Sequence, residues 1–308
     1  MLKKIGWIVF KVFLLLLLTY VIASRWGNFQ QFSALSFQQF SSLSFVYLFL
    51  VLLLMPINWF LEIKKWQLLL QSHQVNFSTA MKSVFGGLTI GMATPARVGE
   101  FAGRIVFFDD AIKKDALLKS AYGGLAQSFF TIAAPLLFLF FNAENYIGYY
   151  SKTTIYLTLV GLLLVLSFLF FINKILSISF VKKYFPPTIF SQFPKSIQLK
   201  IFAYSGLRYC IYLLQYSLLF YALDMPFSFV EIIGKCSLLL FFQSISPLAS
   251  WIDLPIRSGL AVGLFHYTGM PIAFLTFIPF IIWLINLLLP SLMGYFFIYK
   301  LNTNATKS

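Results

Sequence analysis

Three ionisable residues lie close together in an apolar stretch of the sequence, GGLTIGMATPARVGEFAGRIVFF at 86–108. Arg97, Glu100 and Arg104 are spaced i, i+3 and i+7, so on a helix they share one face. Guanidinium groups bind phosphate or carboxylate through paired hydrogen bonds, and a helix N-terminus adds free N–H groups and a favourable dipole. Because Glu100 offsets only part of the positive charge, the spacing predicts a binding site for an anion.

The residues around this cluster predict where its helix begins. Thr94 is a favourable N-cap residue, and Pro95 suits the first helical position, where its missing N–H costs nothing. The apolar arm at 83–93 would be about 16 Å long as a helix, roughly half of a bilayer. Gly99 and Gly103 would let a neighbouring helix approach closely. The stretch is therefore predicted to be a re-entrant hairpin whose second arm starts near the middle of the membrane.

A second segment near the C-terminus repeats this pattern. PARVGEFAG at 95–103 and PIRSGLAVG at 255–263 share Pro-x-Arg-x-Gly-x-x-x-Gly. The candidate binding residues of the second segment are Asp253 and Arg257, and its helix-start and packing residues are Pro255, Gly259 and Gly263. Alternatively, the arginine of each segment pairs with the acid beside it, and these ion pairs only hold the hairpins together.

The overall composition is that of a membrane protein. The 308-residue chain is 60% hydrophobic and 10% charged, whereas soluble domains are about 45–50% apolar and about 25% charged. The net charge of +14 comes mostly from lysines that flank apolar segments, which is typical of membrane topology and gives no reason to predict nucleic-acid binding. No long polar block interrupts the chain, so residues 1–308 are predicted to form a single integral membrane domain.

The apolar segments predict the topology of this domain. Full crossings are predicted at 5–24, 44–61, 117–141, 153–172, 199–222 and 272–299, and re-entrant hairpins at 81–108 and 229–268. With the N-terminus in the cytoplasm, this arrangement places nearly all lysines on the cytoplasmic side. The N-terminal run could also be a signal peptide, but Lys11 within it and the later spans favour a retained helix.

Three crossings separate the two hairpins, so the hairpins enter from opposite sides, as in transporters built from inverted repeats. The predicted fold is therefore all-α and polytopic, with about six full transmembrane helices plus two oppositely oriented re-entrant helical hairpins. We expect it in the plasma (inner) membrane, with both termini in the cytoplasm.

Two further cations are secondary candidates for the site. Arg208 could instead extend to the cytoplasmic interface, and Lys235 could pair with Glu231 four residues earlier. The acids at 109, 110 and 115 alternate with lysines at a helix start and are expected to be solvated. The two histidines, His73 and His266, look isolated, and no catalytic or metal-binding cluster is recognisable. No catalytic residue, metal or cofactor is predicted.

Three stretches together resemble a known family. NWFLEIKKWQLLL at 58–70, TPARVGEFAGR at 94–104 and SPLASWIDLPIRSGL at 246–260 resemble, in order and spacing, the integral membrane domain of the lysylphosphatidylglycerol synthase and flippase family (multiple peptide resistance factor type). The resemblance implies a flippase-like domain for lipids with charged headgroups. It implies motif roles for Arg97, Glu100, Arg104 and Arg257.

This chain departs from the family's pattern at two places. Ser258 stands where the family often has Glu, and GGLAQSFF at 123–130 stands where it often has an Arg and an Asp. The resemblance covers only the membrane domain of the larger family members, without their soluble aminoacyl-transferase domain. Lysyl transfer is therefore not expected of this chain.

Three functions follow as hypotheses. The leading one is a lipid transporter that binds an anionic headgroup, of a phospholipid or a polyprenyl phosphate, between the two hairpins. The second is a membrane-embedded transferase or accessory subunit that acts on a lipid-linked phosphate, with Glu100 or Asp253 as general base. The third is a scaffold for cell-envelope enzymes. Membrane lipids are the expected partners, and the sequence leaves open a homo-oligomer or a cell-envelope enzyme partner.

Overall fold

The computed structural model describes residues 42–146, 160–161, 193–246, 254–265 and 272–305. All the elements within these ranges are helices, so the predicted all-α class is confirmed. The predicted crossing at 5–24 lies outside the described residues, and so does the crossing at 153–172 apart from two of its residues. Asp253 and His266 also lie outside them.

Three apolar helical segments are long enough to cross a membrane. They belong to α3 (Ser42–Leu69), α6 (Asp110–Tyr146) and the continuous stretch of α13 (Ile272–Trp283), η4 (Leu284–Leu288) and α14 (Leu289–Ala305). The shortest of these apolar segments has 27 residues, and about 20 helical residues are enough to cross the hydrocarbon core. These segments contain the crossings predicted at 44–61, 117–141 and 272–299, and they indicate a multi-pass membrane protein.

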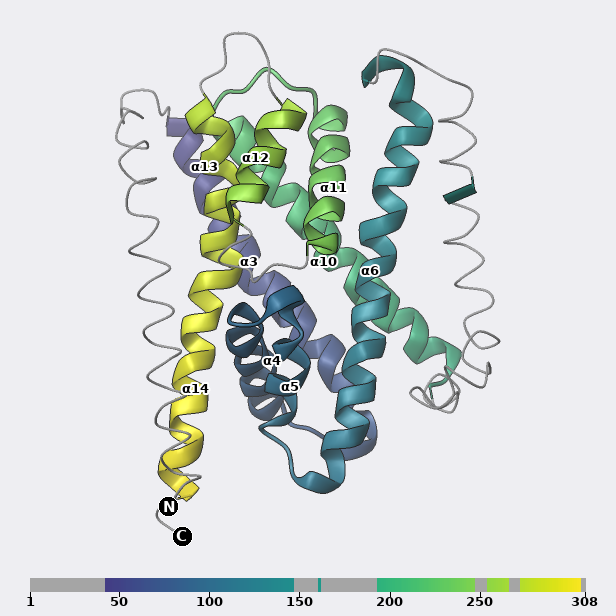
Figure 1. The fold of residues 1–308 in the computed structure, drawn as a ribbon, viewed down its shortest axis with the longest axis vertical. Coiled ribbons are helices and arrows are strands. Elements are labelled where there is room, and N and C mark those ends of the chain that lie inside the picture. Colours follow the sequence, from purple (N-terminus) through teal and green to yellow (C-terminus); the bar gives the residue numbers. More distant parts are fainter. Residues whose placement is uncertain (1–41, 147–159, 162–192, 247–253, 266–271, 306–308) are drawn as a thin grey trace.

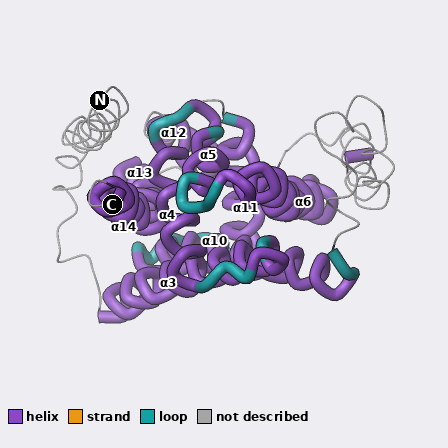
Figure 2. The backbone as a smooth tube through the Cα atoms, turned by 90° about the horizontal axis from the view of Figure 1, so that it is seen from below, coloured by secondary structure: helices purple, strands orange, loops and turns teal. Residues whose placement is uncertain are grey.

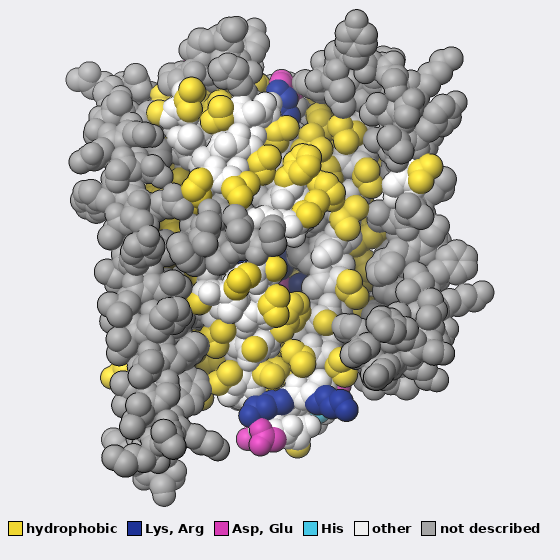
Figure 3. Space-filling model, in the orientation of Figure 1, with side chains coloured by type: hydrophobic (Ala, Val, Ile, Leu, Met, Phe, Trp, Pro, Cys, Tyr) yellow, Lys and Arg dark blue, Asp and Glu magenta, His cyan; other side chains and the backbone are white. Residues whose placement is uncertain are grey.

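The surface agrees with this arrangement. In Figure 3, hydrophobic side chains are spread over the described face, and charged side chains lie mainly at its lower and upper ends, with a small group near its middle. The exposed hydrophobic residues include Phe49 of α3, Phe141 of α6 and Phe296 of α14. A broad apolar surface of this kind is stable in contact with lipid tails rather than with water.

A fourth long helix packs against α3. This helix, α10 (Lys195–Ala222), has 28 residues and covers residues 199–222, where a crossing is predicted, but it is not one of the three apolar segments described above. It lies beside α3 on one side of the structure (Figure 2). Buried polar contacts join the two helices, among them a hydrogen bond of 3.0 Å from Gln215 Nε2 to the Val51 carbonyl.

Two pairs of shorter helices lie in opposite halves of the structure. The first pair is α4 (Phe77–Met92) and α5 (Gly99–Ile105), in the lower half of Figure 1. The second pair is α11 (Phe229–Ile245) and α12 (Leu254–Phe265), in the upper half. Each half has its own hydrophobic core, one around Trp66 and Leu88 and the other around Phe220 and Phe265.

Small residues bring α4 and α5 into close contact. A Cβ atom added to Gly103 would lie 2.7 Å from the Cα atom of Gly87, which no side chain can tolerate without movement of the backbone. The same test gives a different result for the second segment. Among the described residues, no atom lies within 4 Å of a Cβ added to Gly259 or Gly263. The close helix contact predicted at these two glycines is therefore not seen there.

Candidate functional site

The helix predicted to start at Thr94 and Pro95 begins four residues later than expected. Thr94 has an extended backbone, and Pro95 opens a short 3₁₀ turn, η3 (Pro95–Arg97). Ala96 and Arg97 then adopt left-handed φ angles of 49° and 57°, which interrupt the helix. The α-helix α5 starts only at Gly99, whose N–H donates to Thr94 Oγ1 at 2.8 Å. Thr94 therefore caps α5 from across the turn.

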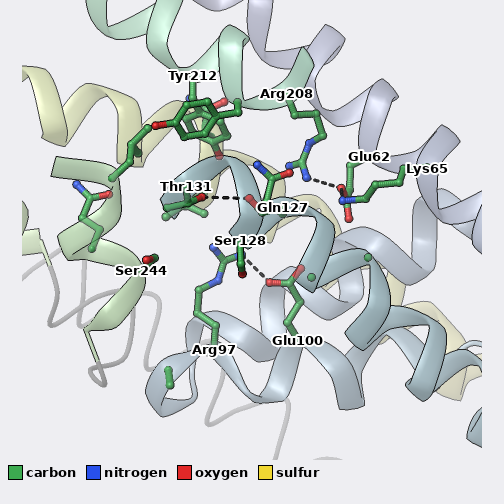
Figure 4. Close-up of a pocket in the computed structure, with 18 of the residues that line it drawn as sticks. Glu62, Lys65, Arg97, Glu100, Gln127, Ser128, Thr131, Arg208, Tyr212 and Ser244 are labelled. Carbon is green, nitrogen blue, oxygen red and sulfur yellow. Dashed lines mark hydrogen bonds and ion pairs between the residues drawn. The ribbon is translucent and has the colours of Figure 1, made fainter. Parts of the chain in front are cut away.

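The turn places Arg97 before α5 and still within reach of Glu100. Arg97 Nη2 donates to one oxygen of the Glu100 carboxylate at 2.7 Å, as Figure 4 shows. Arg104 Nη2 donates to the other oxygen, also at 2.7 Å. Left-handed backbone at non-glycine residues costs about 1–2 kcal/mol per residue, and such strain concentrates at functional sites. The three charges of the first segment therefore form one cluster at a strained turn.

Arg104 extends this cluster to another helix. Its Nη2 also donates to Glu62 of α3 at 2.7 Å. The backbone of Arg104 is held as well, because Ser83 Oγ donates to its carbonyl at 2.7 Å and Trp66 Nε1 donates to Ser83 Oγ at 3.0 Å. The guanidinium also faces the Trp66 ring at 5.3 Å. Arg104 is thus fixed at both its backbone and its side chain.

Glu62 is the centre of the buried charges. It is only 2% exposed and contacts Lys65 at 2.7 Å, Arg104 at 2.7 Å and Arg208, with which it forms a very close ion pair. Arg208 Nε also donates to Asn58 Oδ1 at 2.8 Å. Arg208 is therefore buried inside the protein and paired with an acid.

Sequence reasoning missed Glu62 and Lys65. Glu62 followed directly after a predicted crossing, and Lys65 was assigned to the cytoplasmic lysines, although it is only 2% exposed. One signal was present in the sequence: Glu62 is the only acid in the apolar helix at 42–69, and a lysine follows it at i+3. An acid and a base at this spacing on an apolar helix indicate a buried pair.

These charges line a cavity of about 340 Å³ between the two halves of the structure. Pockets for small ligands have volumes of about 300–1,000 Å³. Its charged lining residues are Glu62, Lys65, Arg97, Glu100, Arg104, Arg208 and Arg257. Both segments of the repeated sequence pattern therefore contribute an arginine to the same cavity.

The directly bonded charges do not balance. Among the described residues, Lys65, Arg97, Arg104 and Arg208 share two carboxylates, those of Glu62 and Glu100. These four cations and two anions leave an excess of two positive charges. A single charged side chain at the bilayer centre costs about 2.5–3.5 kcal/mol on insertion scales. An excess of this kind favours an anionic ligand.

Several polar atoms around the cavity have no hydrogen-bond partner among the described residues. The buried donors are Trp59 Nε1, Arg97 Nε, Arg104 Nε and Gln243 Nε2, the buried acceptors are Gln127 Oε1 and Asn286 Oδ1, and the Tyr209 hydroxyl can act as either. Nearly all buried polar groups of proteins find a partner. The cavity can therefore bind a molecule that carries both acceptors and donors.

Other candidate residues lie outside the cavity. Lys235 binds Glu231 at 2.7 Å, which is the i,i+4 pair considered for it, and neither residue lines the cavity. Pro255 lies in the first turn of α12, as expected of a helix-start residue, but it does not line the cavity.

The acids at the start of α6 differ from one another. Asp110 is exposed and pairs with Lys113, in line with the expectation of solvated charge. Asp115 instead contacts His73 Nε2 at 2.7 Å and Lys119 at 2.6 Å. His73 was expected to be isolated, and this was wrong because the turn after α3 brings it to α6. In the described part of the chain, no group of acids, histidines or cysteines could hold a metal ion.

The chemistry of this cavity is the main guide to function. Comparison of the chain with protein families, with curated proteins and with solved structures found no match.

Proposed function

We propose that this chain binds an anionic lipid headgroup, that of a phospholipid or a polyprenyl phosphate, in the cavity and passes it across the membrane. The observation that carries the proposal is the excess of positive charge around a cavity to which both Arg97 and Arg257 contribute. Arginines bind phosphate through two parallel hydrogen bonds. The resemblance of the TPARVGEFAGR segment to a lipid flippase domain points to the same class of ligand.

The proposal includes a topology. The pair α4–α5 and the pair α11–α12 act as two re-entrant hairpins of opposite orientation, and the long helices together with the segments at 5–24 and 153–172 make about six crossings. Two features support this arrangement. The pairs lie in opposite halves of the structure (Figure 1), and residues of α5, α11 and α12 line the same cavity. Transporters with inverted repeats hold their substrate at such a place.

The exposure of the charged cluster supports a role in transport rather than a purely structural role for these charges. The side chain of Arg97 is 35% exposed and that of Glu100 is 21% exposed, whereas Glu62 is buried. The charged cluster therefore reaches from the surface of the protein into its interior. A headgroup could enter along this path while its acyl chains stay in the surrounding lipid.

The second departure from the family's pattern, the GGLAQSFF stretch at 123–130, falls on the wall of the cavity. Gly123, Gly124, Gln127 and Ser128 of the GGLAQSFF stretch line it, and all of them are uncharged. In this proposal, α6 therefore contributes hydrogen-bonding groups rather than charge. The substrate can therefore differ from that of family members that have an Arg and an Asp in this segment.

The enzymatic alternative, with Glu100 or Asp253 as general base, has less support at Glu100, and Asp253 lies outside the described residues. A general base needs a carboxylate that can accept a proton from the substrate. Both oxygens of Glu100 already accept hydrogen bonds from arginines, and both oxygens of Glu62 are bound to cations. These contacts fit carboxylates that organise the cations better than carboxylates that move protons.

The test is transport of a fluorescent anionic phospholipid in proteoliposomes that contain the purified full chain. We expect transport by the wild-type protein and its loss in the double variant Arg97→Ala with Arg257→Ala. The matched control is Lys113→Ala with Lys114→Ala, which removes the same charge from residues outside the cavity. Transport that is unchanged in the arginine variant, or equally reduced in the control, would contradict the proposal.

A further inference from the structure

Three of the described residues that line the cavity are exposed at the protein surface, and they come from three different elements. They are Ala96 of η3, Ser128 of α6 and Ser244 of α11. Arg97 follows Ala96 in the same turn, and its side chain is 35% exposed. In Figure 4, the guanidinium group of Arg97 lies between Ser128 and Ser244. The cavity is therefore open to the outside at the place that these residues surround.

The opening lies near the middle of the long helices rather than at their ends. Ser128 is the central residue of α6, which contains an apolar segment long enough to cross a membrane. Ala96 lies in the turn that joins α4 to α5, and Ser244 lies in the last turn of α11. Figure 1 shows these inner ends of the two helix pairs near mid-height, with α6 and α14 running vertically. In the proposed topology, the cavity thus opens at the middle of the membrane's depth.

The rim of the opening is apolar. Val98, which follows Arg97, is 63% exposed, and Ile245, which follows Ser244, is 59% exposed. Leu125 is exposed as well and lies one helical turn before Ser128. Exposed hydrophobic side chains of this kind are stable in contact with lipid tails rather than with water. The rim therefore fits lipid, although the cavity behind it is charged.

The backbone at the opening fits a cavity at membrane depth. The left-handed φ angles of Ala96 and Arg97 interrupt the helix there. Irregular backbone within a membrane is tolerated only where it is buried in protein or lines a hydrated cavity. Figure 3 also shows a small group of charged side chains near the middle of the described face, away from its lower and upper ends. Charge therefore reaches the lipid-facing surface of the protein at mid-height.

We infer that the cavity opens sideways into the hydrocarbon core of the bilayer, between η3, α6 and α11, and that a lipid enters and leaves through this lateral opening. The inference rests on the proposed function, because it names the route to the same cavity. The small side chains of Ala96, Ser128 and Ser244 keep the lateral opening clear. The apolar rim contacts the acyl chains while the headgroup reaches Arg97.

The first experiment narrows the lateral opening with a large side chain. Ser128→Trp and Ser244→Trp are tested separately, with a fluorescent anionic phospholipid in proteoliposomes that contain the full chain. We expect each variant to lose most of its transport while the Tm changes little, because both positions are exposed. The matched control is Leu137→Trp, at an exposed position of α6 that does not line the cavity. Full transport in both serine variants, or an equal loss in the control, would overturn the inference.

The second experiment identifies the surroundings of the lateral opening without measuring transport. Cys210→Ser and Cys236→Ala remove the natural thiols, and Ser128→Cys or Ser244→Cys then carries a nitroxide spin label. We expect each label to collide more often with dissolved oxygen, which concentrates in the hydrocarbon core, than with a water-soluble nickel chelate. More frequent collision with the chelate would indicate a mouth that opens to water, and the inference would be wrong.

Two reference positions on α6 calibrate this measurement. Leu137→Cys reports a lipid-facing site, and Lys114→Cys reports an exposed site at the charged start of the helix. The two experiments also separate the inference from the proposed function. If the wild-type protein transports no lipid, the proposed function fails whatever the labels report. If it transports lipid but the labels at 128 and 244 behave like the one at 114, only the lateral opening fails.

Discussion

Glu62 of α3 and Arg104 of α5 form a buried ion pair of 2.7 Å, although 42 positions separate them in the sequence. The pair ties the hairpin of α4 and α5 to a long apolar helix. Arg208 of α10 binds the same carboxylate from a position 146 residues away. A single acid therefore connects three separate parts of the chain at the wall of the cavity.

The first prediction concerns this acid. Glu62→Gln leaves Lys65, Arg104 and Arg208 close together without their shared anion, and breaking a buried pair typically costs about 3–5 kcal/mol. We expect a clear fall in the Tm of the purified protein in detergent. The control is Asp115→Asn, which also removes a carboxylate bound to a lysine but at a partly exposed site, where a pair contributes about 0–1 kcal/mol. A similar Tm for the two variants would contradict the central role of Glu62.

The second prediction concerns the contact between α4 and α5. Gly103→Ala would place a methyl group 2.7 Å from the backbone of Gly87, and overpacking of this kind costs about 1–3 kcal/mol. Thermal unfolding should therefore show a lower Tm. Gly263→Ala is the matched control, because the space around that position is open among the described residues. It should keep or slightly raise the Tm, and the prediction fails if the two variants behave alike.

The third prediction concerns the cap of α5. Thr94→Val keeps the shape of the side chain but removes the oxygen that accepts the Gly99 N–H. Loss of an N-cap typically costs about 1 kcal/mol, and here it would also loosen the turn that holds Arg97. We expect slower transport of anionic lipid as well as reduced stability. Thr94→Ser retains the oxygen and should behave like the wild type, so a defect of equal size in the serine variant would argue against the cap.

The fourth prediction concerns a neutral donor in the cavity wall. Trp59→Phe removes the unpaired Nε1 donor but keeps an aromatic ring for Arg208, whose guanidinium lies 5.6 Å from the Trp59 ring. If Nε1 binds the headgroup, transport of anionic lipid should fall by about threefold to tenfold while the Tm changes little. Unchanged transport with a lowered Tm would instead assign Trp59 to packing alone.

The sequence predicted the parts of the site that depend on local pattern. The proline, glycine and arginine spacing identified the two segments, and the structure brings Arg97 and Arg257 to one cavity. The sequence also suggested that Arg97 pairs with Glu100, which the structure shows, but it did not predict that Glu62 would meet Arg104 and Arg208. The contacts of Glu62 with Arg104 and Arg208 depend on how α3, α5 and α10 pack together, and no local spacing encodes them.

The start of α5 shows a second limit of sequence reasoning. Thr94 and Pro95 are favourable residues for a helix start, and a helical turn does begin there. Ala96 and Arg97 nevertheless take left-handed angles that their residue types disfavour. Such angles are imposed by the surroundings, here by the bonds of Thr94 to Gly99 and of Arg97 to Glu100. Intrinsic preference alone could not reveal them.

The carboxylates of Glu62 and Glu100 also bear on how long a ligand would stay. A phosphate that enters the cavity must compete for guanidinium groups that these two acids already hold. In a carrier, such competition shortens the residence time of the headgroup, because the two acids form their ion pairs with the arginines again as the headgroup leaves. A cavity lined by arginines alone would hold its cargo too tightly for turnover, so the resident acids favour release as much as the arginines favour capture.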